Sequence, residues 1–144
     1  MTVNGHRLPE EFLEALSDPD FIPNVGSKYF KDEFDSYGNV FESELGTLYA
    51  TSDAIAAATA KLSEHFVADD VYGASSDPED APGAIPDILD FSQLLCFGTS
   101  GDGAPFCFDY RGNPDSPDVI WWDDFYWRKV SPNFKTFLEL FDAP

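Results

Sequence analysis

The stretch FGTSGDGAPFCFDYRG, residues 97–112, places four glycines, two aspartates and a cysteine among apolar residues. Glycine supplies positive φ angles at no steric cost, so this stretch is typical of a turn followed by a returning strand. We predict a hairpin in which Cys96 lies opposite Cys107, and Phe97 therefore lies opposite Phe106. This register gives the hairpin one wholly apolar face, as a half-buried sheet requires, made of Leu95, Phe97, Phe106, Phe108 and Tyr110.

Two binding functions are alternatives to a turn for this glycine-rich stretch. A phosphate-binding loop ends in Gly-Lys-Ser/Thr between a strand and a helix, and GTSGDG (98–103) has neither that ending nor that context. Calcium prefers oxygen ligands, but DPEDAPGA (77–84) and SGDGAPFCFDYRG (100–112) both lack the acid spacing and terminal glutamate of an EF-hand. The sequence therefore predicts a turn here, with no metal site and no cofactor.

Three stretches space their apolar residues as amphipathic helices do: LPEEFLEAL (8–16), TSDAIAAATAKLSEHF (51–66) and SPNFKTFLELF (131–141). Ser52 or Asp53 is suited to cap the second helix, and Ser131 followed by Pro132 to cap the third. Short aromatic and β-branched runs between them are typical of strands. They are ESELGTLYA, LLCF, PFCFDY, DVIWW and FYWRK.

This order of elements predicts an α+β fold in a single domain over residues 1–144. We expect a mainly antiparallel sheet of about 4–6 strands, with N-terminal, middle and C-terminal helices packed around it.

The charge of the chain is strongly negative, with 27 acidic against 8 basic residues and a formal net charge of −19. Between Lys61 and Arg111 there is no lysine or arginine. Such a field repels nucleic acid and anionic membranes and accelerates encounters with basic partners. A surface adapted for solubility or high salt explains the same charge, and the sequence leaves both interpretations open.

The N-terminus lacks the apolar core of a signal peptide, and no apolar run approaches membrane-spanning length. We therefore expect a cytoplasmic protein without membrane contact, in which Cys96 and Cys107 are free thiols.

Catalytic residues are scarce in this sequence. A nucleophile needs an activating base, and the only histidines are His6 and His65. Cys107 on an apolar strand is typical of inert packing, and adjacent acids such as Asp123 and Asp124 are typical of a solvated turn. The sequence therefore predicts a protein that is not an enzyme.

All three tryptophans lie in DVIWWDDFYWRKV, residues 118–130. Side chains alternate along a strand, so Trp121 and Trp122 must point to opposite faces of the sheet. Aromatic side chains ringed by carboxylates make an anchor site for a basic protein partner. We predict a partner-binding surface made of Asp77, Glu79, Asp80, Asp102, Asp109, Trp122, Asp123, Asp124 and Tyr126.

Four stretches in this order resemble the SUKH superfamily, which includes the Smi/Knr cell-wall synthesis regulators of fungi: LPEEFLEAL (8–16), GDGAPFCFDYR (101–111), PDVIWWD (117–123) and VSPNFKTFLELF (130–141). The agreement is closest over residues 85–141 and looser over 17–84. The resemblance implies an α+β domain whose mixed, mainly antiparallel sheet is surrounded by helices.

The resemblance also implies a function. Most bacterial members look like immunity proteins, which bind and neutralise a secreted polymorphic toxin in the producing cell, and many such toxins are basic nucleases. It therefore implies a cognate toxin domain as partner, with no direct binding of nucleic acid. The alternative is a regulatory or scaffold protein of cell-wall or envelope synthesis with the same fold. The resemblance leaves open whether the protein is a monomer or a homodimer.

Overall fold

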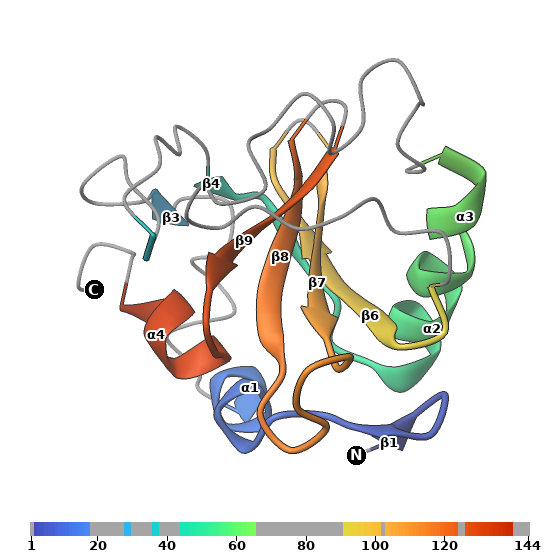
Figure 1. Ribbon diagram of the computed structural model, residues 1–144, viewed down its shortest axis with the longest axis horizontal. Helices are drawn as coiled ribbons and strands as arrows, with labels where there is room; N and C mark the ends of the chain where they lie inside the picture. The colour runs from blue at the N-terminus through green and yellow to red at the C-terminus, as the bar shows by residue number, and fades with distance from the viewer. Residues whose placement is uncertain are drawn as a thin grey trace.

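Strands between residues 47 and 131 form one five-stranded antiparallel sheet in the computed structural model, which describes residues 2–17, 28–29, 36–37, 44–65, 91–101, 103–123 and 126–139. The strands stand in chain order, so each pairs with the one before it (Figure 1). They are β5 (Thr47–Leu48), β6 (Leu94–Thr99), β7 (Pro105–Asp109), β8 (Asp118–Asp123) and β9 (Tyr126–Ser131). The predicted α+β fold with a mainly antiparallel sheet is confirmed.

The pairing of β6 with β7 has the predicted register at its start and then shifts by one residue. Cys96 lies opposite Cys107, as expected. A β-bulge follows, so that Gly98 lies opposite Phe106, and the predicted pairing of Phe97 with Phe106 is wrong. A bulge of this kind sets two residues of one strand against a single residue of its partner.

The connection between β6 and β7 is the turn that its glycines predicted. The N–H of Ser100 donates to the carbonyl of Ala104 at 2.9 Å, and the N–H of Gly103 donates to the carbonyl of Ser100 at 3.0 Å. Gly103 has a φ of 91°, in the left-handed region that side chains other than glycine rarely adopt. The glycine-rich stretch therefore has a structural role here.

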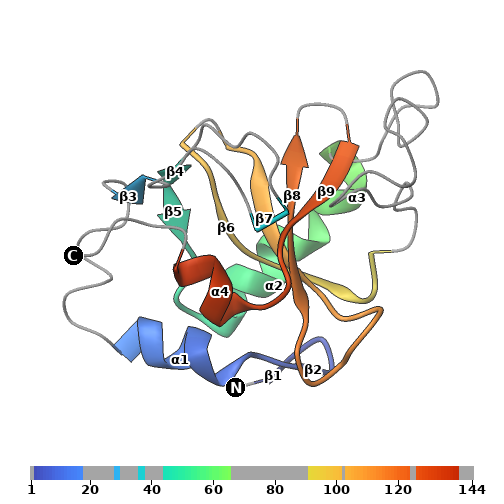
Figure 2. The ribbon, with the colours of Figure 1, turned by 60° about the vertical axis from the view of Figure 1, so that its left-hand side comes forward.

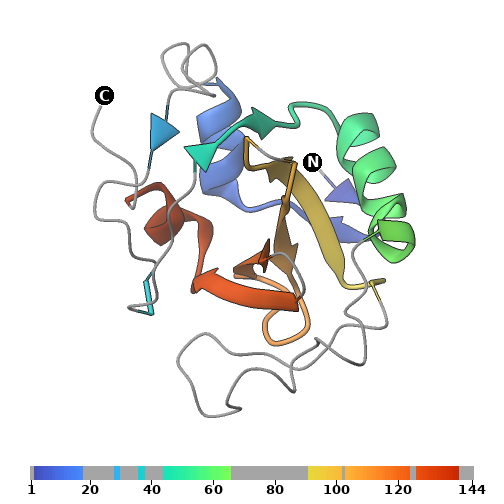
Figure 3. The same cartoon turned by 90° about the horizontal axis from the view of Figure 1, so that it is seen from above.

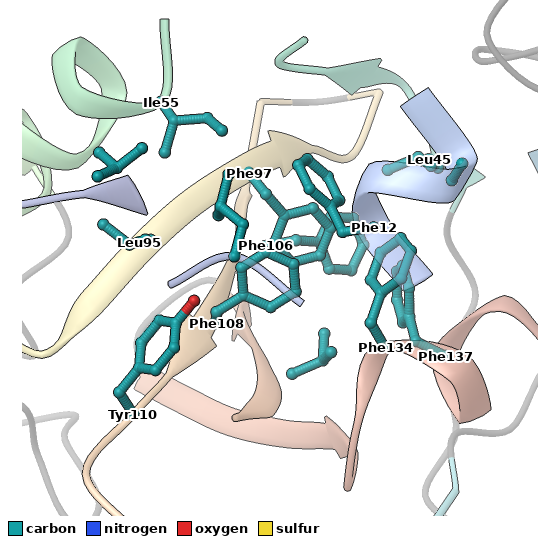
Figure 4. Packing of buried hydrophobic residues seen from close by; sticks show 14 of the residues in the cluster. Phe12, Leu45, Ile55, Leu95, Phe97, Phe106, Phe108, Tyr110, Phe134 and Phe137 are labelled. Carbon is teal, nitrogen blue, oxygen red and sulfur yellow. The ribbon is translucent and has the colours of Figure 1, made fainter. Parts of the chain in front are cut away.

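Two helices, α1 (Glu10–Ser17) and α4 (Phe134–Leu138), lie over one face of the sheet (Figure 2). A cluster of buried phenylalanine rings lies between them and the sheet. Phe97 lies among these rings, and its centroid is 4.3 Å from that of Phe108. It also contacts four other rings, those of Phe12, Phe106, Phe134 and Phe137 (Figure 4). This is the apolar face that the sequence predicted, covered by the N-terminal and C-terminal helices.

Helix α2 (Ser52–Ala60) and the short α3 (Leu62–His65) lie beside β6 (Figure 3). The strand β5 pairs only with the last two residues of β6, so the earlier part of β6 meets the helix instead. Buried Thr59 joins the two elements. Its hydroxyl accepts from the N–H of Cys96 at 2.9 Å and donates to the carbonyl of Ile55 at 2.7 Å. The helix thus covers a strand edge that could otherwise pair with another chain.

Replacing this hydroxyl should cost stability. Thr59→Val keeps the shape of the side chain and leaves the N–H of Cys96 buried without its acceptor, which costs about 1–3 kcal/mol. Urea unfolding of the two proteins measures this difference, with Thr47→Val, at an exposed strand position, as the control. A loss no larger than that of the control would show that the Thr59 hydrogen bond does not stabilise the edge.

Two helix N-caps differ from the prediction. Thr51 caps α2 in place of Ser52 or Asp53. Asn133 caps α4 in place of Ser131, and its carboxamide oxygen accepts a hydrogen bond of 2.8 Å from the main chain one turn further on. Ser131 instead ends β9, where its hydroxyl donates to the Asn133 carbonyl at 2.7 Å.

The N-terminus forms a small hairpin, which was not predicted from the sequence. Strands β1 (Thr2–Val3) and β2 (His6–Arg7) are joined by Asn4 and Gly5, with φ values of 51° and 83°. Positive φ at both central residues defines a type I′ turn, for which Asn-Gly is the preferred sequence. The pair β3 (Lys28–Tyr29) and β4 (Glu44–Leu45) is also antiparallel.

The hairpin docks against the start of β6 and the end of β7. The ring of His6 stacks on Tyr110 with centroids 4.6 Å apart, and its Nε2 lies 2.7 Å from the carbonyl oxygen of Ser92. The hydroxyl of Tyr110 donates to the carbonyl of Arg7 at 2.8 Å. These contacts join the first residues of the chain to its last third.

Candidate partner interface

The residues predicted to bind a partner fall into three groups. Asp109 and Trp122 are buried, with 4% and 9% of their surface exposed. Asp123 and Tyr126 end β8 and begin β9, where their backbones lie opposite each other. The others lie outside the described residues: Asp77, Glu79, Asp80, Asp102 and Asp124.

The structure separates these positions between two ends of the sheet. With antiparallel strands in chain order, the β6–β7 and β8–β9 connections leave one end, and the β7–β8 connection leaves the other (Figure 1). Trp122, Asp123 and Tyr126 lie at the first end. Asp109 pairs with Asp118 at the second, which is about 16 Å from Asp123 along β8. The predicted set is therefore not a single cluster.

The carboxylate of Asp109 is held by Arg111. Its Oδ1 accepts from Nε of Arg111 at 2.9 Å and from the N–H of the same residue at 3.0 Å, and its Oδ2 accepts from Nη2 at 2.8 Å. The hydrogen bond from Arg111 to Asp109 raises the pKa of Arg111. Such a two-pronged pair fixes both groups, so Asp109 stabilises the strand end instead of offering a free charge.

Asp118 lies opposite Asp109, so two carboxylates meet across β7 and β8. Burial is the largest single influence on the pKa of Asp118 and raises it, whereas the ion pair with Lys129, 3.4 Å away, lowers it. Asp109 adds repulsion that raises the pKa further, and Arg111 opposes it. Folding therefore disfavours the ionised form of Asp118.

This shift gives a pH dependence with a definite sign. An acidic group whose pKa is higher in the folded than in the unfolded state makes the protein less stable as the pH rises through the folded-state pKa. We therefore expect Asp118→Asn to raise the free energy of unfolding at pH 7. The gain should vanish below about pH 3, where the aspartic acid is protonated in both states. Denaturant unfolding at the two pH values measures it, with exposed Asp115→Asn as the control. A loss of stability at pH 7 would mean that the Lys129 ion pair outweighs burial.

The adjacent tryptophans point to opposite faces, as the strand alternation predicted. Trp122 packs edge-on against Trp127, with ring centroids 5.5 Å apart. Trp121 packs on Phe106 at 6.1 Å, and the guanidinium of Arg128 lies 5.5 Å from its ring centroid. Trp122 belongs to a second buried cluster on the far face of the sheet, which also contains Leu62, Leu94, Cys96, Ala104, Cys107, Ile120 and Trp127.

A cleft of about 490 Å³ lies at the sheet end from which the β7–β8 connection leaves. Basic and acidic residues line it together: Arg7, Lys135, Glu10, Glu11 and Asp115. This cleft was not among the sites predicted from the sequence. The sequence nevertheless contained an indication of it. Three of the stretches that resemble the SUKH superfamily contribute residues to the walls of the cleft, namely 8–16, 117–123 and 130–141.

Other kinds of site find little support in the described part of the chain. There, no three His, Cys, Asp or Glu side chains gather closely enough to hold a metal ion. The thiol of Cys107 is buried, and burial raises its pKa well above the ordinary range, so it is a poor nucleophile. No described helix has the length and apolar character needed to cross a membrane.

Comparison with known proteins identifies the family. The model of the SMI1 / KNR4 family (SUKH-1) matches residues 4–140, which is nearly the whole chain. No curated protein and no solved structure matches this chain. The matched region contains β2 of the N-terminal hairpin, the five-stranded sheet and the described helices α1 to α4. With this fold and this match, the chain belongs to the SMI1/KNR4 (SUKH-1) family.

Proposed function

We propose that this chain is a non-enzymatic immunity protein, which binds a cognate secreted polymorphic toxin in the cytoplasm of the producing cell and blocks it. The observation that carries this proposal is the family match over residues 4–140, since SUKH proteins are typically immunity proteins against such toxins. The net charge of −19 supports it, because an acidic inhibitor associates rapidly with a basic toxin and competes with the nucleic acid of a nuclease.

The proposed contact surface includes Asp123 and Tyr126, whose backbones lie opposite each other where β8 ends and β9 begins. Asp102, Asp124 and the acidic segment Asp77, Glu79 and Asp80, which lie outside the described residues, are proposed to bind the partner with them. Trp122 is buried and packs on Trp127, and in this way it supports the ends of β8 and β9. We leave Asp109 out because Arg111 engages both of its oxygens.

Growth rescue tests the function directly. A susceptible host expresses the toxin-domain product of the neighbouring reading frame, with and without this protein. Restored growth and a stable complex of the two proteins are expected. Toxicity without rescue would reject the immunity role. A cell-envelope defect on deletion of the gene would instead favour the alternative, a regulatory or scaffold protein of cell-wall synthesis.

Charge reversal tests the proposed surface. The triple variant Asp77→Lys, Glu79→Lys and Asp80→Lys should slow association with the toxin about tenfold at low ionic strength, and less as salt increases. Stopped-flow association kinetics measure this. The matched control reverses three exposed acids elsewhere, Glu14, Glu64 and Glu139, and changes the net charge equally.

The control separates a local effect from the general field of the protein. A tenfold loss confined to the first variant supports the acidic segment as part of the interface. Equal losses in both variants would assign the effect to overall charge, and unchanged rates in both would reject electrostatic steering.

A further inference from the structure

We propose that Cys96 and Cys107 form a cross-strand disulfide when a small disulfide such as oxidised glutathione is present, so that the β6–β7 hairpin is a site of reversible thiol modification. Both thiols are free and buried, on the sheet face away from α1 and α4. The two residues are direct partners across the two strands. This proposal does not depend on the proposed function.

The hydrogen bonding of the main chain decides what kind of pair this is. In an antiparallel strand the N–H and C=O of one residue point to the same side. The N–H of Cys96 donates to Thr59 in α2, and so points away from β7. The pair of Cys96 and Cys107 is therefore a non-hydrogen-bonded one, in which the Cα atoms are about 4.5 Å apart and the side chains are closest.

This spacing suits a disulfide, whose Cα atoms are usually about 4.4–6.8 Å apart. The two thiols already interact, because a hydrogen bond with Cys96 adds to burial in raising the pKa of Cys107. Neither strand has to shift in register to bring the sulfur atoms together. The pairing with Ile120 on β8 also remains intact, since Cys107 bonds to that strand from its other side.

The reaction is a thiol–disulfide exchange in two steps. The thiolate of Cys96 attacks one sulfur of oxidised glutathione, whose S–S bond breaks and releases one glutathione thiolate. The thiolate of Cys107 then attacks the Cys96 sulfur and releases the second. The two thiol protons pass to the two glutathione molecules. Forming the new S–S bond oxidises the two cysteines by two electrons, and these electrons reduce glutathione disulfide to two thiols. Burial slows the exchange, because the hairpin must open before glutathione reaches either thiol.

The test compares this equilibrium in the folded and unfolded chain. The purified full chain is equilibrated with glutathione buffers under native conditions and in concentrated guanidinium, starting from both the reduced and the oxidised protein. Acid quenching and intact mass then give the disulfide fraction. We expect the equilibrium constant for forming the disulfide to be about a hundredfold higher in the folded chain than in the unfolded chain. The entropy of closing so short a loop, which the fold has already lost, predicts this difference.

By linkage, the oxidised protein should unfold at a higher temperature than the reduced one. Cys96→Ser and Cys107→Ser are the controls, and in neither should the same buffers raise the unfolding temperature, because a single thiol forms at most a mixed disulfide with glutathione. A native equilibrium constant equal to or below that of the unfolded chain would overturn the proposal, as would an oxidised chain that fails to refold.

Discussion

Phe97→Ala should lower the free energy of unfolding by about 4 kcal/mol. The ring is fully buried, and five other rings surround it, from both helices and from β7. Those neighbours belong to three separate elements, so no single movement can fill the cavity that alanine leaves. A domain of this size is typically stable by about 5–15 kcal/mol, so the loss would consume much of the total.

Denaturant unfolding followed by tryptophan fluorescence measures this effect. Glu14→Ala, at an exposed position on α1, is the control and should change the stability by less than about 0.5 kcal/mol. A loss below about 1 kcal/mol for Phe97→Ala would mean that the phenylalanine cluster repacks, and that α1 and α4 are not fixed on the sheet by this ring.

Gly98→Val should lower the free energy of unfolding by about 3 kcal/mol, although valine favours strands. A Cβ on Gly98 would lie 2.4 Å from the main-chain oxygen of Thr47, closer than any real contact. Because the obstacle is main chain and not a flexible side chain, β5 must move away from β6. The substitution therefore breaks the pairing of Leu48 with Gly98.

The matched control is Gly112→Val. No atom lies within 4 Å of a Cβ built on Gly112, and its exposed position tolerates a side chain. The loss of glycine entropy in the unfolded chain acts similarly at both positions, and the preference of valine for strands favours the substitution at Gly98 only. A larger loss of stability at Gly98 than at Gly112 therefore reports the contact with β5. Equal stabilities for the two variants, by thermal or urea unfolding, would show that β5 is free to shift.

The fold was largely predictable because its central hairpin has a strong sequence signal. Two apolar runs of alternating character flank a glycine-rich turn, and only one register puts Cys96 against Cys107 and the phenylalanines on one face. The bulge between Cys96 and Gly98 was not predictable from that pattern, because the pattern sets one residue of each strand opposite one residue of the other. The caps differed for a similar reason: Ser131 fits a cap locally, but the extent of β9 decides where the helix begins.

The candidate site was less predictable, because composition gives the charge of a surface but not its geometry. Asp109 resembles its acidic neighbours in the sequence, and only the fold reveals that Arg111 binds both of its oxygens. Trp122 was chosen as an anchor, yet pairing with Trp127 buries it. The cleft between α1, α4 and the β7–β8 connection joins residues more than a hundred positions apart, which periodicity cannot relate.

The docking of the N-terminal hairpin sets the order in which the chain can fold. The sheet from β6 to β9 closes through short connections, and such local contacts form quickly. Arg7 and Tyr110, by contrast, are in contact although they lie 103 positions apart in the sequence. During synthesis the hairpin of β1 and β2 leaves the ribosome before β6 and β7, so the site against which it docks does not exist until Tyr110 has emerged. The hairpin is thus among the last elements to reach its native contacts.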